Sequence, residues 1–515
     1  MNNNGVVAAG HQETAQAASI ILNEGGNAFD AVVAAHFAAC VAEPALASLG
    51  GGGFLLAHSP KREDRVYDFF VHTPAKRKHA DDIEFFPVSV DFGATQQEFH
   101  VGIGAVATPG VVRGLCAIQR DLGRMPLRRL IEPALQLARD GVRVNRFQAY
   151  LFDLLRAIYT FRSDTRRLFQ TSTQGQGLIE EGECFVNPDF ADCLECLAIE
   201  GEDLFYRGEI ARAISDLCAA SGGYLNRSDL ENYAVIKRRP LSLSYRNARL
   251  LTNPPPSSGG LLIAFALKLL EDVELKRLGF GSAPYLQLLA RVIGFTEKAR
   301  LDIGLSESAS TPVQRLLDEE YLHAYRREIF GRPSCSRGTT QISVADRFGN
   351  LASLTTSNGE GSGYLIPGTG IVLNNMLGEE DLNPRGFHCW EKDTRMTSMM
   401  APSLLFLEHR RIALGSGGSN RLRSAILQFL LNLIDFRMSL EQAVNSPRIH
   451  YESGRLNVEH GFDPGEIRKL GDAFPDSKVW DSLNLFFGGL HAVAVEAGGF
   501  DGAGDPRRDG ISVVV

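Results

Sequence analysis

The first part of the chain carries two apolar patterns with helical spacing. In residues 14–23, alanines and aliphatic residues recur on one helix face, and the glycines at 25–26 end the pattern. Residues 29–42 are almost wholly apolar, which is typical of a helix buried on all sides. The sequence therefore predicts a half-buried helix followed by a fully buried one.

Helix-rich and strand-rich stretches follow one another along the rest of the chain. Two short apolar runs beside glycines, at 54–57 and 105–107, are typical of buried strands. Residues 115–270 have mainly helical spacing, with breaks at Pro126, Gly141, Gly222-Gly223 and 254–260, and a further amphipathic helix is predicted at 285–300. Beyond Thr339 we expect a helix at 422–435 and strands at 342–344, 351–354, 370–373, 403–407, 411–414, 456–458 and 491–495.

This order of elements favours the α+β class. Helical layers would enclose paired antiparallel sheets, since each sheet must bury one face against another layer. The length of 515 residues would also permit two or three domains.

Composition and charge narrow the classes of function. The chain is 44% hydrophobic and 22% charged, with a formal net charge of -8, so it has no electrostatic reason to bind nucleic acid. The basic clusters at 237–239 and 410–411 are interpreted as solvated faces. No stretch of about 18 uncharged apolar residues predicts a membrane span. Residues 1–9 lack the cationic start and apolar core of a signal peptide, which favours a cytoplasmic location.

The cysteines do not form a recognisable framework. Eight are scattered along the chain, and Cys193 and Cys196 are the only close pair. No second pair completes a zinc site, and the helical spacing around them predicts a reduced core pair. We find no Walker A motif and no compact group of histidines and carboxylates, so neither a metal nor a cofactor is expected.

An internal threonine pair, Thr339-Thr340, opens one of the predicted strands. The residues at 346–350, Asp-Arg-Phe-Gly-Asn, predict a hairpin turn after it. A threonine at a chain start can act as nucleophile and base together, because its α-amine can take the hydroxyl proton. Thr339 could work in this way only after cleavage of the Gly338–Thr339 bond. By itself, a β-branched residue at a strand start is more often structural.

Four further segments give the chain a resemblance to a known family. They are GGNAFDA at 25–31 with the glycines at 50–53, TPGVVRG at 108–114, PPPSSGG at 254–260, and a last segment from Thr339 to GSGGS at 415–419. In this order they resemble the γ-glutamyltransferase (glutathione hydrolase) family of N-terminal-nucleophile hydrolases. The similarity runs from about Gly5 to Arg507.

The resemblance implies a fold and a maturation step. The fold would be an αββα sandwich with the nucleophile on a central strand. Cleavage before Thr339 would give a large segment, 1–338, and a small segment, 339–515. Because the motifs lie throughout the chain, both should belong to one compact unit and stay associated. Self-association into a homo-oligomer is left open.

The resemblance also implies the catalytic groups. Thr339 would be the nucleophile, and Ser357 lies where the family has a second hydroxyl residue that binds it. Gly417 and Gly418 lie between a strand and a helix start and would form the oxyanion hole. The glycines at 50–53 are expected to allow a close backbone crossing near the site.

Substrate recognition is where the pattern departs from the family. Phe70 stands where the glutathione-cleaving members have an arginine for the substrate α-carboxylate, so a bidentate cation becomes an apolar ring. Of two carboxylate-binding serines, one remains as Ser398 and the other is Met399. Glu379 stands in for an acid that binds the α-amine, Met376 replaces a glutamine, and Asn358 is counted with the substrate-binding candidates.

The leading hypothesis is a self-processing threonine hydrolase or transferase that cleaves a γ-glutamyl-type amide through an acyl-enzyme and passes the acyl group to water or an amine. Its substrate would be a small amide or peptide. The alternative within the family is an amidohydrolase or acylase that acts on a different N-acyl substrate. A third hypothesis, from another class, is an unprocessed member that only binds a ligand or partner.

Overall fold

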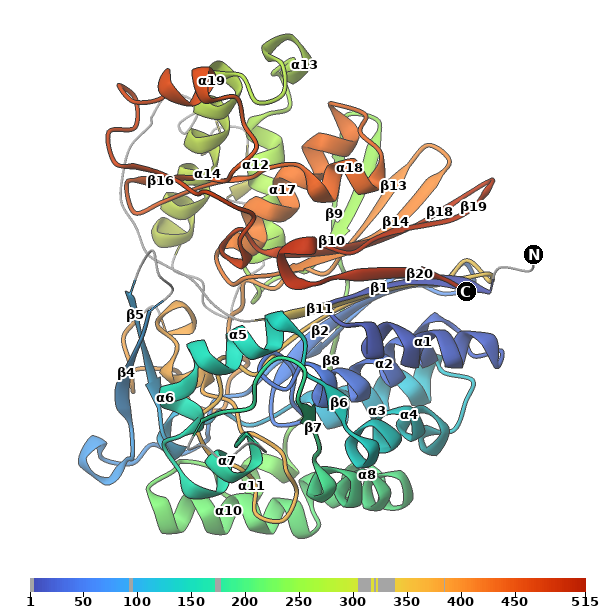
Figure 1. Cartoon of the computed structure of the whole chain (residues 1–515), viewed down its shortest axis with the longest axis vertical. Helices are drawn as coiled ribbons and strands as arrows, with labels where there is room; N and C mark the ends of the chain where they lie inside the picture. Colours follow the sequence, from blue (N-terminus) through green and yellow to red (C-terminus); the bar gives the residue numbers. More distant parts are fainter. Residues whose placement is uncertain are drawn as a thin grey trace.

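The computed structural model describes residues 4–91, 96–171, 177–303, 316–318, 321–322, 339–383 and 385–515. Two sheets lie face to face in the middle of the molecule, and helices cover the outer side of each (Figure 1). This arrangement confirms the predicted αββα sandwich of the α+β class.

The first sheet has seven strands among the described residues, in the order β20-β1-β11-β12-β2-β3-β8, and all neighbours are antiparallel. The strands are β1 (Gly5–Ala9), β2 (Gly52–His58), β3 (Arg65–Phe69), β8 (Ile236–Arg238), β11 (Thr340–Asp346), β12 (Leu351–Ser357) and β20 (Ile511–Val514).

The second sheet has six described strands, in the order β19-β18-β14-β13-β10-β9. They are β9 (Leu241–Tyr245), β10 (Ala248–Thr252), β13 (Ser403–Leu407), β14 (Arg410–Gly417), β18 (Gly489–Glu496) and β19 (Gly499–Ala503). Three smaller sheets join β15 (Ile449–Glu452), β16 (Arg455–Val458) and β17 (Ser477–Val479), β4 (Phe86–Asp91) to β5 (Gln96–Val101), and β6 (Val142–Arg143) to β7 (Cys184–Phe185).

Helices on the outer side of the first sheet pack around α2 (Ala28–Ala42), which is buried along its whole length as predicted. The side chain of Asn27 caps the start of this helix, and the Asn27 amide donates a hydrogen bond to the Asp30 carboxylate. Helix α2 contacts α1 (Gln12–Asn23), α3 (Val111–Leu122) and α4 (Leu127–Asp140). The other helices in this part of the molecule are α5 (Arg146–Leu154), α6 (Arg156–Tyr159), α7 (Ser163–Leu168), α8 (Pro188–Glu200), α9 (Glu202–Tyr206), α10 (Glu209–Ser221) and α11 (Arg227–Glu231).

A second apolar core lies between the other sheet and its own helices, which occupy the upper part of Figure 1. These helices are α12 (Gly259–Leu269), α13 (Leu275–Leu278), α14 (Ala283–Ile303), α17 (Arg421–Ile434), α18 (Leu440–Asn445) and α19 (Pro464–Arg468). The two helical layers therefore bury separate cores against the outer faces of the two sheets.

The layer between the sheets contains two kinds of side chain. The inter-sheet polar cluster consists of Gln341, Ser343, Ser353 and Thr355, and its serines donate hydrogen bonds to backbone carbonyls of the second sheet. The inter-sheet apolar cluster includes Phe54, Phe70, Met376, Met396 and Met400.

The two expected segments of the chain interleave within the first sheet. Strand β1, from the start of the chain, pairs with β11 on one side and with β20 on the other. The Asp346 carboxylate at the end of β11 also accepts a bond from the Ala28 amide at 2.8 Å. One strand of the first segment is thus held between two strands of the second.

Three predictions about local structure were wrong. Residues 105–107 are buried but form no strand, because the Asn374 side chain bonds both the amide and the carbonyl of Ala107 in place of a neighbouring strand. Residues 370–373 make only isolated bridges. Cys193 is buried but Cys196 is exposed, so they are not a core pair. Residues 115–270 are mainly helical as predicted, with the short strands β6 to β10 among the helices.

Candidate active site

Thr339 and Ser357 lie at the same end of the central strand pair. The β11–β12 register pairs Thr340 with Thr356, and one further step of that register sets Thr339 opposite Ser357. Side chains alternate between the two faces of a strand. Because Gln341 and Thr355 face the second sheet, Thr339 and Ser357 are placed on that same inner face. Both are buried.

Gly417 packs directly against Thr339, and Gly418 follows it in the chain. A Cβ atom on Gly417 would come within 2.1 Å of the Thr339 carbonyl oxygen, so only glycine permits this approach. Gly418 has a φ of 118°, and α17 begins three residues later. The structure therefore brings both glycines to the end of β11.

The glycines at 50–53 form the expected close crossing. A Cβ on Gly51 would lie 2.4 Å from the Ser357 carbonyl oxygen, and one on Gly52 would lie 2.7 Å from the Val71 amide nitrogen. These contacts bring the main chain around Phe70 close to Ser357.

Two buried charged groups beside Thr339 were missed in the sequence. Arg508 donates from Nη1 to the Thr339 carbonyl oxygen at 2.7 Å. The Glu43 carboxylate accepts bonds from the hydroxyl groups of Thr340, at 2.8 Å, and Thr14, at 2.7 Å. Arg508 thus anchors the backbone of Thr339, and Glu43 anchors the side chain of Thr340.

Burial shifts the pKa values of both groups. It raises the pKa of Glu43, against the effect of its two threonine donors and of Arg508. Burial lowers the pKa of Arg508 to about 10, although Asp505 and Glu43 favour its charged form. Arg508 therefore stays cationic at neutral pH.

A network of buried ion pairs surrounds Arg508. Asp505 accepts bonds from Arg448 at 2.7 Å and Arg507 at 3.1 Å, and Arg507 also pairs with Glu459. Buried charges of this kind require partners. The signal in the sequence was the run Asp505-Pro506-Arg507-Arg508 directly before a terminal strand, a charge density unusual for a buried segment.

The Phe70 side chain is 1% exposed and belongs to the inter-sheet apolar cluster. Its ring stacks on Phe54, with centroids 5.5 Å apart. Met376 lies in the same cluster. Two of the positions at which the sequence departs from the expected pattern are therefore part of one apolar region.

Arg395 is a buried cation that contacts the main chain at Phe70. It donates to the Phe70 carbonyl and to the Tyr233 hydroxyl, and its Nε lies 3.3 Å from an Asp68 carboxylate oxygen. Its guanidinium group thus holds the end of β3 in place.

Ser398 and Met399 lie in a tight turn beside α12. The Ser398 Oγ accepts a bond from the Met400 amide at 3.0 Å, and its carbonyl accepts from the Ser258 amide at 2.8 Å. Met399 packs in the core outside the second sheet, with its sulfur accepting from the Ser258 hydroxyl. Met399 is therefore not brought together with Phe70 and Met376.

Asn358 and Glu379 lie next to Ser357. The Gly359 amide donates to the Ser357 Oγ at 2.9 Å, closing a turn. A Cβ on Gly359 would lie 2.3 Å from a Glu379 carboxylate oxygen, so the acid packs against that turn. The Asn358 Oδ1 is buried and accepts no hydrogen bond within the described ranges.

The described part of the chain contains no group of three or more histidine, cysteine, aspartate or glutamate side chains arranged to bind a metal ion. Nor does it contain a helix with the length and apolar character needed to cross a bilayer.

Comparison with known proteins identifies relatives over nearly the whole chain. Acylase ACY 1 proenzyme from Pseudomonas sp. (strain SE83) is 34% identical, over 99% of this chain and 93% of its own length. Glutathione hydrolase proenzyme from Escherichia coli (strain K12) is 31% identical, over 98% and 90%. The crystal structure of cephalosporin acylase from Bacillus halodurans superposes with a TM-score of 0.85 at 24% identity, covering 99% of this chain and 96% of that one.

The family model described as gamma-glutamyltranspeptidase matches residues 14–515. The match includes both helical layers, every described strand of the two sheets except β1, and the end of β11 where Thr339 and Ser357 lie. The chain therefore belongs to the gamma-glutamyltranspeptidase family of hydrolases and acyltransferases.

Proposed function

We propose that Thr339 is the nucleophile of an amide hydrolase that matures by cleavage of its own chain. Gly338 lies outside the described residues, and the bond between Gly338 and Thr339 is the proposed site of the cut. Cleavage would divide the chain into 1–338 and 339–515 and give Thr339 a free α-amine. The names of two relatives, both proenzymes, support a maturation step.

In the proposed reaction, the Thr339 hydroxyl oxygen attacks the carbonyl carbon of the amide while the α-amine takes the hydroxyl proton. The tetrahedral intermediate then collapses, the C–N bond breaks, and the ammonium group returns the proton to the leaving amine. Water or a second amine attacks the resulting ester by the same steps and releases the acyl group. No cofactor is needed for this sequence.

The geometry supports roles for the neighbouring groups. Ser357, placed opposite Thr339 by the strand register, would hydrogen-bond the nucleophile and fix its rotamer. Gly417 and Gly418 would present backbone amides to the oxyanion, close to a helix start that favours negative charge. Arg508 would position the nucleophile by holding its carbonyl.

We infer that the preferred acyl group is apolar, so that the enzyme is an N-acyl amide hydrolase. The observation that carries this inference is that Phe70 and Met376 share one buried apolar cluster close to Ser357. A substrate carboxylate placed there would lose its hydration without gaining a cationic partner, which is unfavourable. Arg395, already bonded to Asp68 and Tyr233, is held away from that task. The name of the acylase relative agrees with this inference.

A second candidate is γ-glutamyl transfer or hydrolysis, favoured by the position of Glu379. This buried acid packs against the turn that follows Ser357, where it could bind a substrate α-amine. Asn358, with its buried Oδ1, would offer a second acceptor to that amine. Ser398 would be the remaining group for a carboxylate.

A paired assay separates the two candidates. Intact mass of the purified protein should first show two chains that meet at Thr339. The rates with γ-glutamyl anilide and with anilides of apolar acids are then compared, with Thr339→Ala as the inactive control. We expect kcat/KM to be at least about tenfold higher for the apolar acids, which is about 1.4 kcal/mol of transition-state preference. Efficient γ-glutamyl cleavage with a micromolar KM would instead establish the second candidate.

A further inference from the structure

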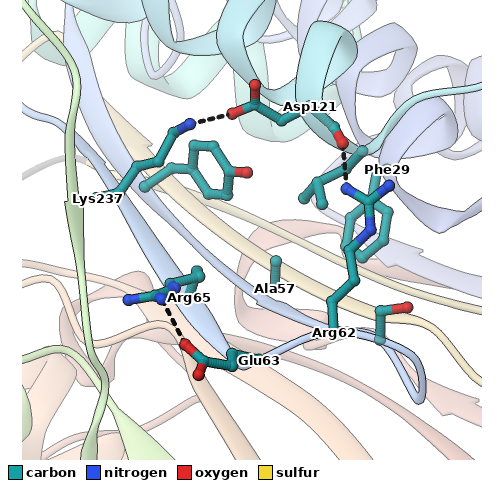
Figure 2. Close-up of a pocket in the computed structure, with 10 residues that line it drawn as sticks. Phe29, Ala57, Arg62, Glu63, Arg65, Asp121 and Lys237 are labelled. Atoms are coloured by element: carbon teal, nitrogen blue, oxygen red, sulfur yellow. Dashed lines mark hydrogen bonds and ion pairs between the residues drawn. The ribbon is translucent and has the colours of Figure 1, made fainter.

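A hollow of about 480 Å³ opens on the first sheet, at the ends of β2, β3 and β8. Ala57 lies in its middle, and Arg62, Glu63, Arg65, Asp121 and Lys237 surround it (Figure 2). Volumes of this size are typical of sites for small molecules.

The hollow is separate from the proposed active site. Ala57 and Tyr67, which line it, pack with the helices outside the first sheet, whereas Phe54 on β2 and Phe70, directly after β3, belong to the cluster between the sheets. Ala57 is also five residues along β2 from Gly52, or roughly 16 Å at the usual rise per strand residue. The sheet itself therefore lies between the hollow and Thr339.

The side chains that line the hollow include one more cation than carboxylate. Lys237 pairs with the Asp121 carboxylate at 2.7 Å, and Arg65 pairs with Glu63. Arg62 donates to the Asp121 main-chain carbonyl instead of a carboxylate. Three cations thus face two carboxylates, on a chain whose net charge is -8.

Arg62 is also held in a defined position. Its bond to the Asp121 carbonyl caps the last turn of α3, where a cation is favoured by the helix dipole. The remaining N–H groups of a guanidinium fork are suited to bidentate binding of a carboxylate.

The floor of the hollow is apolar and partly aromatic. Phe29, Ala57, Tyr67 and Leu122 line it beneath the charged rim. The Lys237 ammonium lies 5.7 Å from the centre of the Tyr67 ring. A flat apolar body would fit against these side chains, with its charged end directed to the rim.

We propose that this hollow is a second binding site, for a small organic carboxylate with a flat apolar body. The carboxylate would bond to Arg62, with Lys237 nearby, and the body would cover Ala57 and Tyr67. The ligand could be a product of the enzyme's own amide hydrolysis or an unrelated metabolite acid, because the recognition chemistry is the same.

The test uses the whole protein and phenylacetate as the probe. Saturation-transfer NMR titrations are run with the unaltered protein and with Arg62→Gln, Lys237→Gln and Arg455→Gln. Arg455 is an exposed, paired cation elsewhere on the surface, so its variant controls for the loss of one charge. Phenylacetamide, which keeps the shape and removes the charge, is titrated alongside.

We expect saturable binding of phenylacetate at millimolar concentration and a Kd at least about tenfold higher in Arg62→Gln, the equivalent of about 1.4 kcal/mol. Lys237→Gln should weaken binding less, and Arg455→Gln should leave it unchanged. Equal binding to the Arg62 variant, equal binding of the amide, or no saturation would each overturn the proposal.

One further variant distinguishes the hollow from the active site. Thr339→Ala should bind phenylacetate as well as the unaltered protein does, whatever the acyl specificity. Loss of binding in Thr339→Ala would place the ligand at the active site and overturn the second site. A series of aromatic acids released from substrates, compared with unrelated acids, then separates the two sources of ligand.

Discussion

The two clusters between the sheets differ in what holds them together. In the polar cluster, Ser343 and Ser353 reach across to carbonyl groups of His491 and Leu414, at 3.0 and 2.7 Å. In the apolar cluster, Phe54, Phe70 and Met376 meet through packing alone. Directional bonds fix the first cluster, whereas shape and volume fix the second.

Because of this difference, the residues proposed for catalysis and those proposed for acyl recognition are held in place by different kinds of interaction. The groups proposed for chemistry, Thr339 and Ser357, lie next to the polar cluster on the same two strands. Their positions depend on a backbone that is held by hydrogen bonds. The groups proposed for acyl recognition belong to the apolar cluster, where one side chain can replace another of similar volume at small cost. Changes in substrate can therefore accumulate without disturbing the nucleophile.

The largest effect on activity is expected at the proposed nucleophile, Thr339, beside the polar cluster. Thr339→Ala removes the hydroxyl group, so the protein should remain one chain and lose activity by a factor on the order of 10⁶. Thr339→Ser keeps both hydroxyl and amine and should still be processed. Electrophoresis and an N-terminal sequence check both variants. Active protein with Thr339 still internal would refute the assignment.

A change at Arg508 tests whether Thr339, beside the polar cluster, needs the bond that Arg508 donates to its carbonyl. Arg508→Ala leaves the buried Thr339 carbonyl without its donor, which should cost about 1 to 3 kcal/mol of unfolding free energy and slow the cut. Arg508→Lys retains the charge and should lose less. Urea denaturation and the fraction of cleaved chain measure both effects. Unaltered stability and processing in the alanine variant would contradict the role given to Arg508.

Ser357→Ala should keep the fold and slow turnover of the processed enzyme. The lost hydrogen bond orients the nucleophile, so we expect a decrease of about 10- to 1000-fold, or about 1.4 to 4 kcal/mol of barrier. Ser357→Thr restores a hydroxyl and should recover most of the rate. Kinetics on fully cleaved samples decide the matter, and an unchanged kcat would show that Ser357 is misassigned.

Phe70→Arg addresses the apolar cluster. The ring is 1% exposed and stacked on Phe54, so the guanidinium would be buried and the unfolding midpoint should fall. Among molecules that fold, the ratio of γ-glutamyl to N-acyl kcat/KM should rise about tenfold, since a substrate carboxylate gains a partner. Phe70→Leu, the apolar control, should leave the ratio near its starting value. A ratio unaffected by arginine would separate Phe70 from acyl recognition.

Acid should destabilise the protein through three buried histidines, of which His491 contacts the polar cluster through its carbonyl group. Burial lowers the pKa of His36 to about 3, and those of His11 and His491 to about 4. The unfolded chain takes up protons near pH 6.5 and the folded chain only near pH 3 to 4. Each of these histidines therefore contributes stability above pH 6.5 that is lost as the pH falls, at most about 1.4 kcal/mol per pH unit.

A histidine variant isolates this small effect. His36→Gln should reduce the loss of unfolding free energy between pH 7 and pH 5 by about 1 to 2 kcal/mol. His409→Asn, at an exposed position, should leave the pH dependence unchanged. Calorimetry across this range provides the comparison, and parallel curves for His36→Gln and the unaltered protein would argue against a neutral buried His36.

Local patterns in the sequence were sufficient for much of this architecture. The buried helix α2, the hairpin of β11 and β12, and strand β13 lie where periodicity and turn residues put them. Residues 105–107 and 370–373 were misjudged because their backbone groups are satisfied by a distant side chain and by isolated bridges. An apolar run alone cannot reveal whether a partner strand is present.

The candidate site was predictable only in part for the same reason. Thr339 and its neighbours belong to contiguous motifs that can be read along the chain. Glu43 and Arg508 approach Thr339 and Thr340 from opposite ends of the sequence, and a lone charged residue gives no sign of a distant partner. The separation of Met399 from Phe70 likewise depends on which core each side chain enters.

The position of β1 between β11 and β20 sets the order of events in maturation. Were 339–515 released before folding, the edges of β11 and β20 that β1 covers would be among its unpaired strand edges, and such edges are templates for aggregation. With β1 in place, both edges are occupied by a strand of its own protein. We therefore expect the proposed cut to follow folding, and separation of the two pieces would break the pairing of β1 on both of its sides.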